Sequence, residues 1–236
     1  MSDTLHDTLD ALLRSRTTSN PALNKLLDDY TRSKLVLVVV GGLFLLGFVG
    51  LTVFSWRRFR TASTTDRKWT FEKRTYLSFA ALGALVSALA AVVIAANISN
   101  AIDPRTGFTG SLGMIPNAPP GSQTGRLHQA FTAWLQTSNT NTPTLVRHAI
   151  DDRLAWQQPK AIICTVLLGT FVWLSVRIWH TRIEKSRAHE SRRYPRSGAL
   201  RLAGWGSVTA CLLLTLMVMG NTQASFAPLG LTLFYG

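Results

Sequence analysis

Ionisable side chains are missing from the interiors of four long apolar segments of this 236-residue chain, at 35–55, 77–98, 161–178 and 203–219. Only Arg177 stands within these segments, near the end of the third. Charged groups inside a bilayer usually mark ion paths, proton relays or cofactor sites, so their absence excludes the most recognisable mechanisms of membrane proteins. The sequence therefore favours a structural or regulatory membrane component over an enzyme or a pump.

Cysteine is equally scarce. Cys164 and Cys211 fall inside the third and fourth apolar segments, which excludes a disulfide in the long polar loop between the second and third segments. The chain has no Gly-rich phosphate loop and no Ser-His-Asp set, and a lone boundary histidine, His180, cannot supply a bis-histidine haem site. We therefore expect no cofactor and no bound metal.

The apolar segments themselves are long enough to cross a membrane. About 20 residues in a helix, rising about 1.5 Å each, span a hydrocarbon core of about 30 Å. Trp and Tyr residues stand at the segment edges, as expected at the headgroup level. Apolar character begins only at Leu35, so we expect no cleavable leader. The sequence predicts an all-α, four-transmembrane-helix integral membrane protein with a mostly helical and irregular extracytoplasmic loop.

The basic residues predict the orientation. The link after the first span carries a net charge of +5 and the link after the third carries +6, against 0 for the N-terminal tail and +2 for the long loop. Short cytoplasmic links collect Lys and Arg, so both termini and the long loop should be extracytoplasmic. The predicted divisions are a tail at 1–34, spans at 35–56, 76–98, 161–179 and 202–220, cytoplasmic links at 57–75 and 180–201, the external loop at 99–160 and a C-terminal tail at 221–236.

The same basic links suggest a partner. Arginines beside a membrane attract anionic lipid headgroups, and links of about twenty residues are too short to build a nucleic-acid-binding domain. We therefore expect anionic lipids, and no nucleic acid, at the cytoplasmic face, and the residues that we expect to contact them are Arg57, Arg58, Arg60, Arg192 and Arg193. The lack of a leader, the sparse cysteine and the cationic bias together favour a bacterial cytoplasmic membrane.

Outside the spans, the spacing of apolar residues predicts further helices. A short amphipathic helix follows Ser2 or Asp3, and a second begins at Pro21 and could continue into the first span as one long helix. Glycine and proline predict irregular structure from Asp103 to Gly125. Two amphipathic helices should follow it, at 126–136 and 143–157.

The second of these loop helices carries the one group of residues that could form a catalytic site. His148 with Asp151 and Asp152 could ligate a metal or shuttle a proton, which would make the protein an envelope enzyme. The alternative is an ordinary solvated helix face, on which Arg147 pairs with Asp151 and His148 with Asp152, because residues four apart lie side by side.

Small residues in the spans favour association with other helices, since they let helix backbones approach closely in lipid. The leucine stripe of the external helix also needs a cover, either the chain's own loop, the headgroup region or another subunit. We therefore expect an accessory, structural or assembly subunit bound to other integral membrane subunits, with interface residues Gly42, Gly47, Gly50, Leu23, Leu26, Tyr30, Ala84 and Ala88.

A channel is the alternative function. A homo-oligomeric channel or small-solute transporter would need a polar pathway through the spans. The hydroxyl and amide groups available for it are those of Thr52, Ser87, Asn97, Thr165, Thr170, Ser175, Thr209 and Thr215. Hydroxyls in helices more often bond to the preceding turn of their own helix, which weakens this alternative.

Overall fold

A computed structural model describes residues 3–15, 20–62, 64–65, 68–119, 121–188 and 198–235. Their regular structure is helical, apart from the two-residue strands β1 (Thr64–Thr65) and β2 (Lys68–Trp69), which pair antiparallel. Four of the described helices are long and apolar enough to cross a membrane, which confirms the all-α, four-span class. The chain divides into two compact units, unit 1 (Met1–Val39, Ala95–Ala161 and Gly220–Gly236) and unit 2 (Val40–Ile94 and Ile162–Met219).

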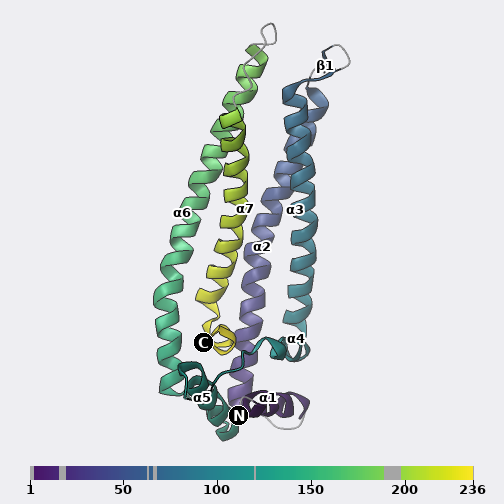
Figure 1. Cartoon of the computed structure of the whole chain (residues 1–236). Helices are drawn as coiled ribbons and strands as arrows, with labels where there is room; N and C mark the ends of the chain where they lie inside the picture. The colour runs from purple at the N-terminus through teal and green to yellow at the C-terminus, as the bar shows by residue number, and fades with distance from the viewer. Residues whose placement is uncertain are drawn as a thin grey trace. The chain divides into compact units, whose positions relative to one another are not determined.

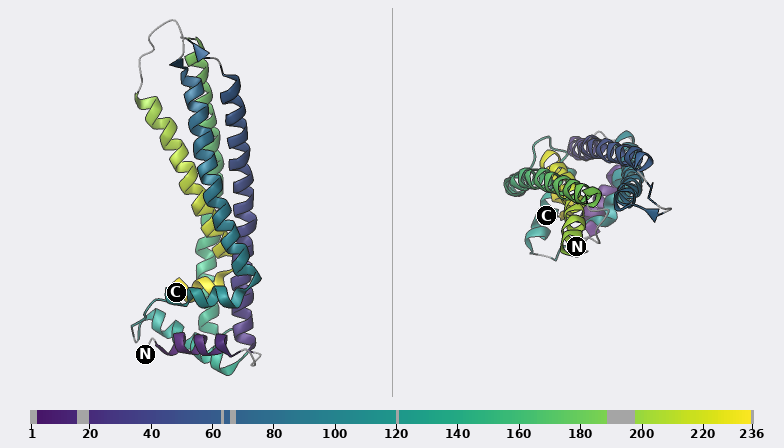
Figure 2. Two further views of the ribbon diagram at one scale, coloured as in Figure 1. Left: turned by 90° about the vertical axis from the view of Figure 1, so that its right-hand side faces the viewer. Right: turned by 90° about the horizontal axis from the view of Figure 1, so that it is seen from above.

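Besides β1 and β2, unit 2 contains the link-side ends and the apolar parts of the four long helices. These are α2 (Pro21–Thr61), α3 (Phe71–Ile102), α6 (Thr144–Ala188) and α7 (Gly198–Phe226), whose unit 2 parts run alongside one another (Figures 1 and 2). Large apolar side chains such as Leu46, Val92 and Val166 are more than 60% exposed on them. In water this surface would be unfavourable, so it is the surface that hydrocarbon tails would cover.

Within unit 2, the first two spans approach closely at a glycine. A Cβ atom placed on Gly83 of α3 would lie 2.5 Å from the hydroxyl oxygen of Thr52 and 3.4 Å from the backbone oxygen of Phe48, both on α2. Only a residue without a side chain fits there, because real Cβ atoms do not approach so closely. Gly83 therefore belongs to the packing of the chain's own helices.

Three aromatic rings join α3, α6 and α7 in the same unit. Phe79 and Trp179 meet edge to face with centroids 5.0 Å apart, and Trp205 meets Trp179 edge to face at 5.6 Å. Edge-to-face contact places the positive edge of one ring against the negative face of another, which stabilises the pair beyond its buried area. Trp179 is 7% exposed as a result.

Unit 1 is built from segments that are distant in the sequence. It contains α1 (Asp3–Arg14), α4 (Pro104–Ser111), the 3-10 helix η1 (Leu112–Met114), α5 (Gln123–Thr137), α8 (Pro228–Tyr235) and the ends of the long helices. Helix α1 contacts α4 and α5, and α5 contacts α8. One apolar core joins them, in which the side chains of Leu9, Leu26, Phe108, Phe131, Leu135, Val146 and Leu233 are fully buried.

Several helix ends follow their sequence signals. Helix α2 begins at Pro21, directly after the buried Asn20, and runs on into the first span as one helix. The side chain of Ser122 accepts a hydrogen bond from the backbone N–H of Gly125 at 3.0 Å, so it caps α5. A side-chain oxygen at this position satisfies a backbone N–H that the helix itself leaves unpaired.

The prediction of irregular structure from Asp103 to Gly125 was wrong in its first half. Helix α4 occupies Pro104–Ser111, and the carboxylate of Asp103 caps it by accepting a hydrogen bond from the backbone N–H of Thr106 at 3.2 Å. The two glycines inside α4 weaken a helix on their own. Burial of Phe108 at 0% exposure in the unit 1 core compensates for them.

The chain also stays helical where separate elements were predicted. The loop helix and the third span form a single helix, α6, which continues through Pro159. A proline removes one backbone N–H donor from a helix, yet its fixed φ is itself helical. In the C-terminal tail, α7 extends to Phe226 and α8 follows, with Leu229 and Leu233 buried in unit 1.

Candidate functional site

Three of the predicted interface residues form an open face on α2. A Cβ atom added to Gly42, Gly47 or Gly50 would meet no heavy atom within 4 Å, and Gly47 and Gly50 are exposed. The neighbouring Leu43 and Leu46 are 66% and 69% exposed. We call these five residues the α2 glycine face. It presents backbone at which another helix could approach closely, flanked by leucine side chains that could pack around that helix.

Other small residues differ in whether they already pack against helices of the same chain. A Cβ atom on Gly41 would lie 3.3 Å from the terminal methyl carbon of Met219 on α7, so this glycine already packs against its own chain. On α3, Ala80 is buried, whereas Ala84 and Ala88 are exposed. The two exposed alanines are four positions apart, which places them about 40° apart on one side of the helix. They form a second, smaller open face.

The predicted interface residues near the start of α2 do not lie on an open face, and this expectation needs correction. Leu23, Leu26 and Tyr30 are 1%, 0% and 4% exposed, within the core of unit 1. The Tyr30 ring meets Phe108 of α4 edge to face, with centroids 5.4 Å apart. The loop of the same chain covers the leucine stripe, so these three side chains are not available to a partner. From sequence alone, the chain's own loop, the headgroup region and another subunit all remained candidates to cover it.

Two of the three residues proposed for catalysis line a hollow of about 910 Å³ in unit 1, between α5, α6 and α8, whereas Asp151 is not among its lining residues. His148 and Asp152 lie on its wall with Arg126 and Arg153. Within the described part of the chain, no ion pair joins His148 to Asp152 or Arg147 to Asp151, so the predicted i,i+4 pairs are not formed. Burial lowers the pKa of Arg153, against a smaller opposing effect of Tyr235.

Metal ligation would need three or four ligand side chains, commonly His, Cys, Asp or Glu. No group of three His, Cys, Asp or Glu side chains able to hold a metal ion occurs among the residues that the structure describes. Both His148 and Asp152 are exposed. General acids and bases usually act in sites that exclude water, whereas these two side chains are open to it.

The structure describes three of the five arginines that were expected to contact lipid. Arg57, Arg58 and Arg60 are exposed at the end of α2, while Arg192 and Arg193 lie outside the described residues. The guanidinium carbon of Arg58 lies 5.5 Å from the centroid of the Phe54 ring. Such stacking holds an arginine against an aromatic face while leaving its N–H groups for an anion.

One further arginine was not singled out from the sequence. The guanidinium carbon of Arg182 lies 5.0 Å from the centroid of the Trp179 ring and 5.0 Å from that of Phe71. The signal was available, because an arginine three residues after a tryptophan lies on the same helix face. The contact with Phe71, which comes from α3, could be seen only in the folded chain.

Comparison with known proteins gives no function to transfer to this chain. No protein-family model, no curated protein and no solved structure matches it.

Proposed function

We propose that the protein is a non-catalytic accessory, structural or assembly subunit of a larger membrane protein complex. The α2 glycine face carries this proposal, because it is open in the chain's own fold while Gly41 and Gly83 are already used in internal packing. Helices in lipid gain nothing from burying apolar surface against each other, so close backbone approach at small residues is a main source of association. An unoccupied face of this kind suits a helix of another subunit.

The proposed location is a bacterial cytoplasmic membrane, with unit 1 outside and the basic links inside. The charge bias of the links supports this orientation. The segments that form unit 1 are consistent with this orientation, since that unit combines the N-terminal tail, the long loop and the C-terminal tail. The charge rule assigns all three segments to the same side.

A channel is less well supported by the contacts of the span hydroxyls. Thr52 donates its hydroxyl hydrogen bond to the backbone oxygen of Phe48 at 2.8 Å, and Thr170 and Thr215 likewise donate to the residue four positions earlier. Hydroxyls bonded in this way satisfy their own helix and are poor groups for lining a polar path.

The test is a mild-detergent purification of tagged protein from its native membrane, followed by determination of the mass of the intact assembly. We expect a larger partner in fixed ratio. Gly47→Leu should reduce recovery of that partner at least tenfold while membrane insertion is unchanged, because the added side chain keeps the two backbones apart.

The matched control is Gly169→Leu on α6. Gly169 is also exposed, and an added Cβ atom would meet nothing within 4 Å. This variant should keep the partner. A chain that purifies alone or as a homo-oligomer would contradict the proposal, and a Gly47→Leu variant that still binds the partner would show that the assigned face is wrong.

A further inference from the structure

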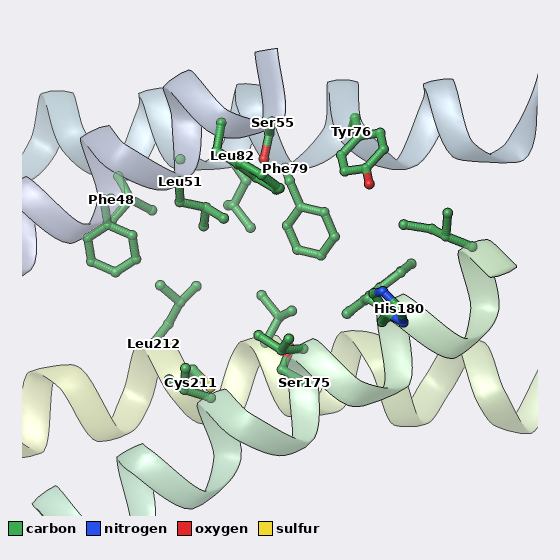
Figure 3. A pocket seen from close by; sticks show the side chains of 18 residues that line it. Phe48, Leu51, Ser55, Tyr76, Phe79, Leu82, Ser175, His180, Cys211 and Leu212 are labelled. Atoms are coloured by element: carbon green, nitrogen blue, oxygen red, sulfur yellow. The ribbon is translucent and has the colours of Figure 1, made fainter. Parts of the chain in front are cut away.

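Unit 2 contains an apolar cavity of about 350 Å³ between the pair α2 and α3 and the pair α6 and α7 (Figure 3). Phe48 and Leu51 of α2, Leu82 of α3 and Leu212 of α7 are among the side chains that line it. The volume lies in the range of small-molecule sites, roughly 300–1,000 Å³. An apolar space of this size suits an apolar molecule or chain, which would restore packing contacts to the lining atoms.

The cavity lies in the half of the bundle that adjoins the basic links. On α3 its lining runs from Tyr76, close to the first link, to Val86, and on α6 it runs from Val172 to Ile183, close to the second. The 11 steps from Val172 to Ile183 correspond to about 16 Å of helix. A hydrocarbon core of about 30 Å contains two leaflets, so the cavity is about as deep as one leaflet.

Polar and cationic groups gather at the link end of this cavity. Tyr76 of α3 and His180 of α6 extend toward each other there (Figure 3). Two arginines stack on rings that line the cavity, since Arg58 lies over Phe54 and Arg182 over Trp179. The cavity is therefore apolar along about one leaflet, and these two arginines stack on rings near its link end, where Glu184 also lies 3.4 Å from Nδ1 of His180.

We propose that this cavity holds an acyl chain of one anionic membrane phospholipid, whose phosphate lies beside Arg58 and Arg182. The chain fills the apolar part with methylene groups, and guanidinium groups bind a phosphate through paired N–H donors. The lipid needs no partner subunit, so the proposal stands apart from the proposed function.

Native mass spectrometry of the purified full-length chain tests the proposal. Delipidated protein is mixed with equal amounts of phosphatidylglycerol and phosphatidylcholine that carry the same acyl chains. We expect one phosphatidylglycerol retained per chain. Leu212→Trp fills the cavity and should reduce retention at least tenfold, and Ser175→Phe, from α6, is the second filling variant. The matched control is Leu213→Trp, at a neighbouring side chain that is 58% exposed.

The headgroup is tested separately. Arg58→Gln combined with Arg182→Gln should remove the preference for phosphatidylglycerol over phosphatidylcholine, while Arg147→Gln, at an exposed position of unit 1, should preserve it. Equal retention by wild type and by a correctly folded filling variant would overturn the acyl-chain site. Equal retention of the two lipids by wild type would overturn the anionic headgroup. Recovery of a polypeptide in place of lipid, or of no lipid at all, would overturn the proposal altogether.

Discussion

Asn20 joins two helices of unit 1 through one buried side chain. Its amide nitrogen donates a hydrogen bond to the backbone oxygen of Leu135 at 2.7 Å, and its amide oxygen accepts one from the backbone N–H of Leu23 at 3.0 Å. It thus caps the start of α2 and holds the end of α5. Sequence indicated the cap, because Asn before Pro is a common helix start, whereas the bond to Leu135 depends on the tertiary fold.

Replacing this asparagine should destabilise unit 1. Asn20→Ala removes the cap and leaves a buried carbonyl without its donor, which together should cost about 2–3 kcal/mol. The measurement is thermal unfolding in detergent, followed by tryptophan fluorescence. Lys25→Ala is the control, since its hydrogen bond to Thr142 is exposed and its loss should change stability by less than about 0.5 kcal/mol. Equal unfolding temperatures of Asn20→Ala and Lys25→Ala would contradict the role assigned to Asn20.

His128 should make unit 1 sensitive to acid. Burial lowers its pKa from the ordinary value of 6.5, more strongly than its hydrogen bond with the backbone of Leu233 raises it. The unfolded chain therefore binds a proton more readily than the folded chain, and the stability that this group contributes above about pH 6.5 is lost as the pH falls through the lowered value.

The check is the midpoint of thermal unfolding measured from pH 7.5 to pH 5. The fall in midpoint should be smaller in His128→Gln than in wild type, because glutamine does not titrate. His148→Gln, at an exposed position, should follow the wild-type curve. Parallel curves for His128→Gln and wild type would show that the buried histidine does not set the acid response.

At the scale of elements, the contact between α2 and α3 should depend on Gly83. Gly83→Ala places a methyl group against Thr52 and Phe48 and should cost about 1–3 kcal/mol. Gly42→Ala, at an open position of α2, should be neutral or slightly stabilising, since alanine favours helix.

A second substitution distinguishes crowding from other effects at this contact. Thr52→Ala removes the oxygen nearest to the added methyl group, so it should restore part of the stability that Gly83→Ala loses. Unfolding in detergent with increasing concentrations of denaturant would measure the stability of Gly83→Ala, Thr52→Ala and the double variant. Additive losses in the double variant would indicate that the two residues do not meet.

The elements differ in how far sequence could predict them. The spans, the start of α2 and helix α5 have strong local signals, namely unbroken apolar runs or a cap followed by helical periodicity. Helices α4 and α8 each contain only eight residues and include glycine, so local preference alone argues against them. They form because Phe108 and Leu233 are buried in a core assembled from distant segments.

The candidate interface residues also differ in how far sequence could predict their role. Glycines that could serve an interface are visible in the sequence, but the same pattern occurs at Gly41 and Gly83, which the chain itself uses. Which of them remain open is decided by how the helices pack. The leucine stripe at Leu23 and Leu26 shows the opposite outcome, because long-range folding covers it. The cavity has no local signal, since its walls come from four helices.

At the scale of the whole molecule, the orientation can be tested with single cysteines. In a background of Cys164→Ala and Cys211→Ala, Asn141→Cys places a thiol in the exposed link between α5 and α6, and Arg60→Cys places one at the end of α2. A membrane-impermeant maleimide should label Asn141→Cys in intact cells and Arg60→Cys only after permeabilisation. The reverse pattern would place unit 1 in the cytoplasm.

The order in which the chain is made limits when unit 1 can finish folding. Its core needs Leu9 from the first helix, Phe131 from the loop after the second span and Leu233 from α8, which follows the fourth span. A nascent chain that stalls before its last hydrophobic helix therefore leaves apolar surface uncovered in this unit. A completed core therefore marks a chain whose four spans have all been synthesised. A protease that recognises uncovered leucines would remove chains whose synthesis stopped earlier.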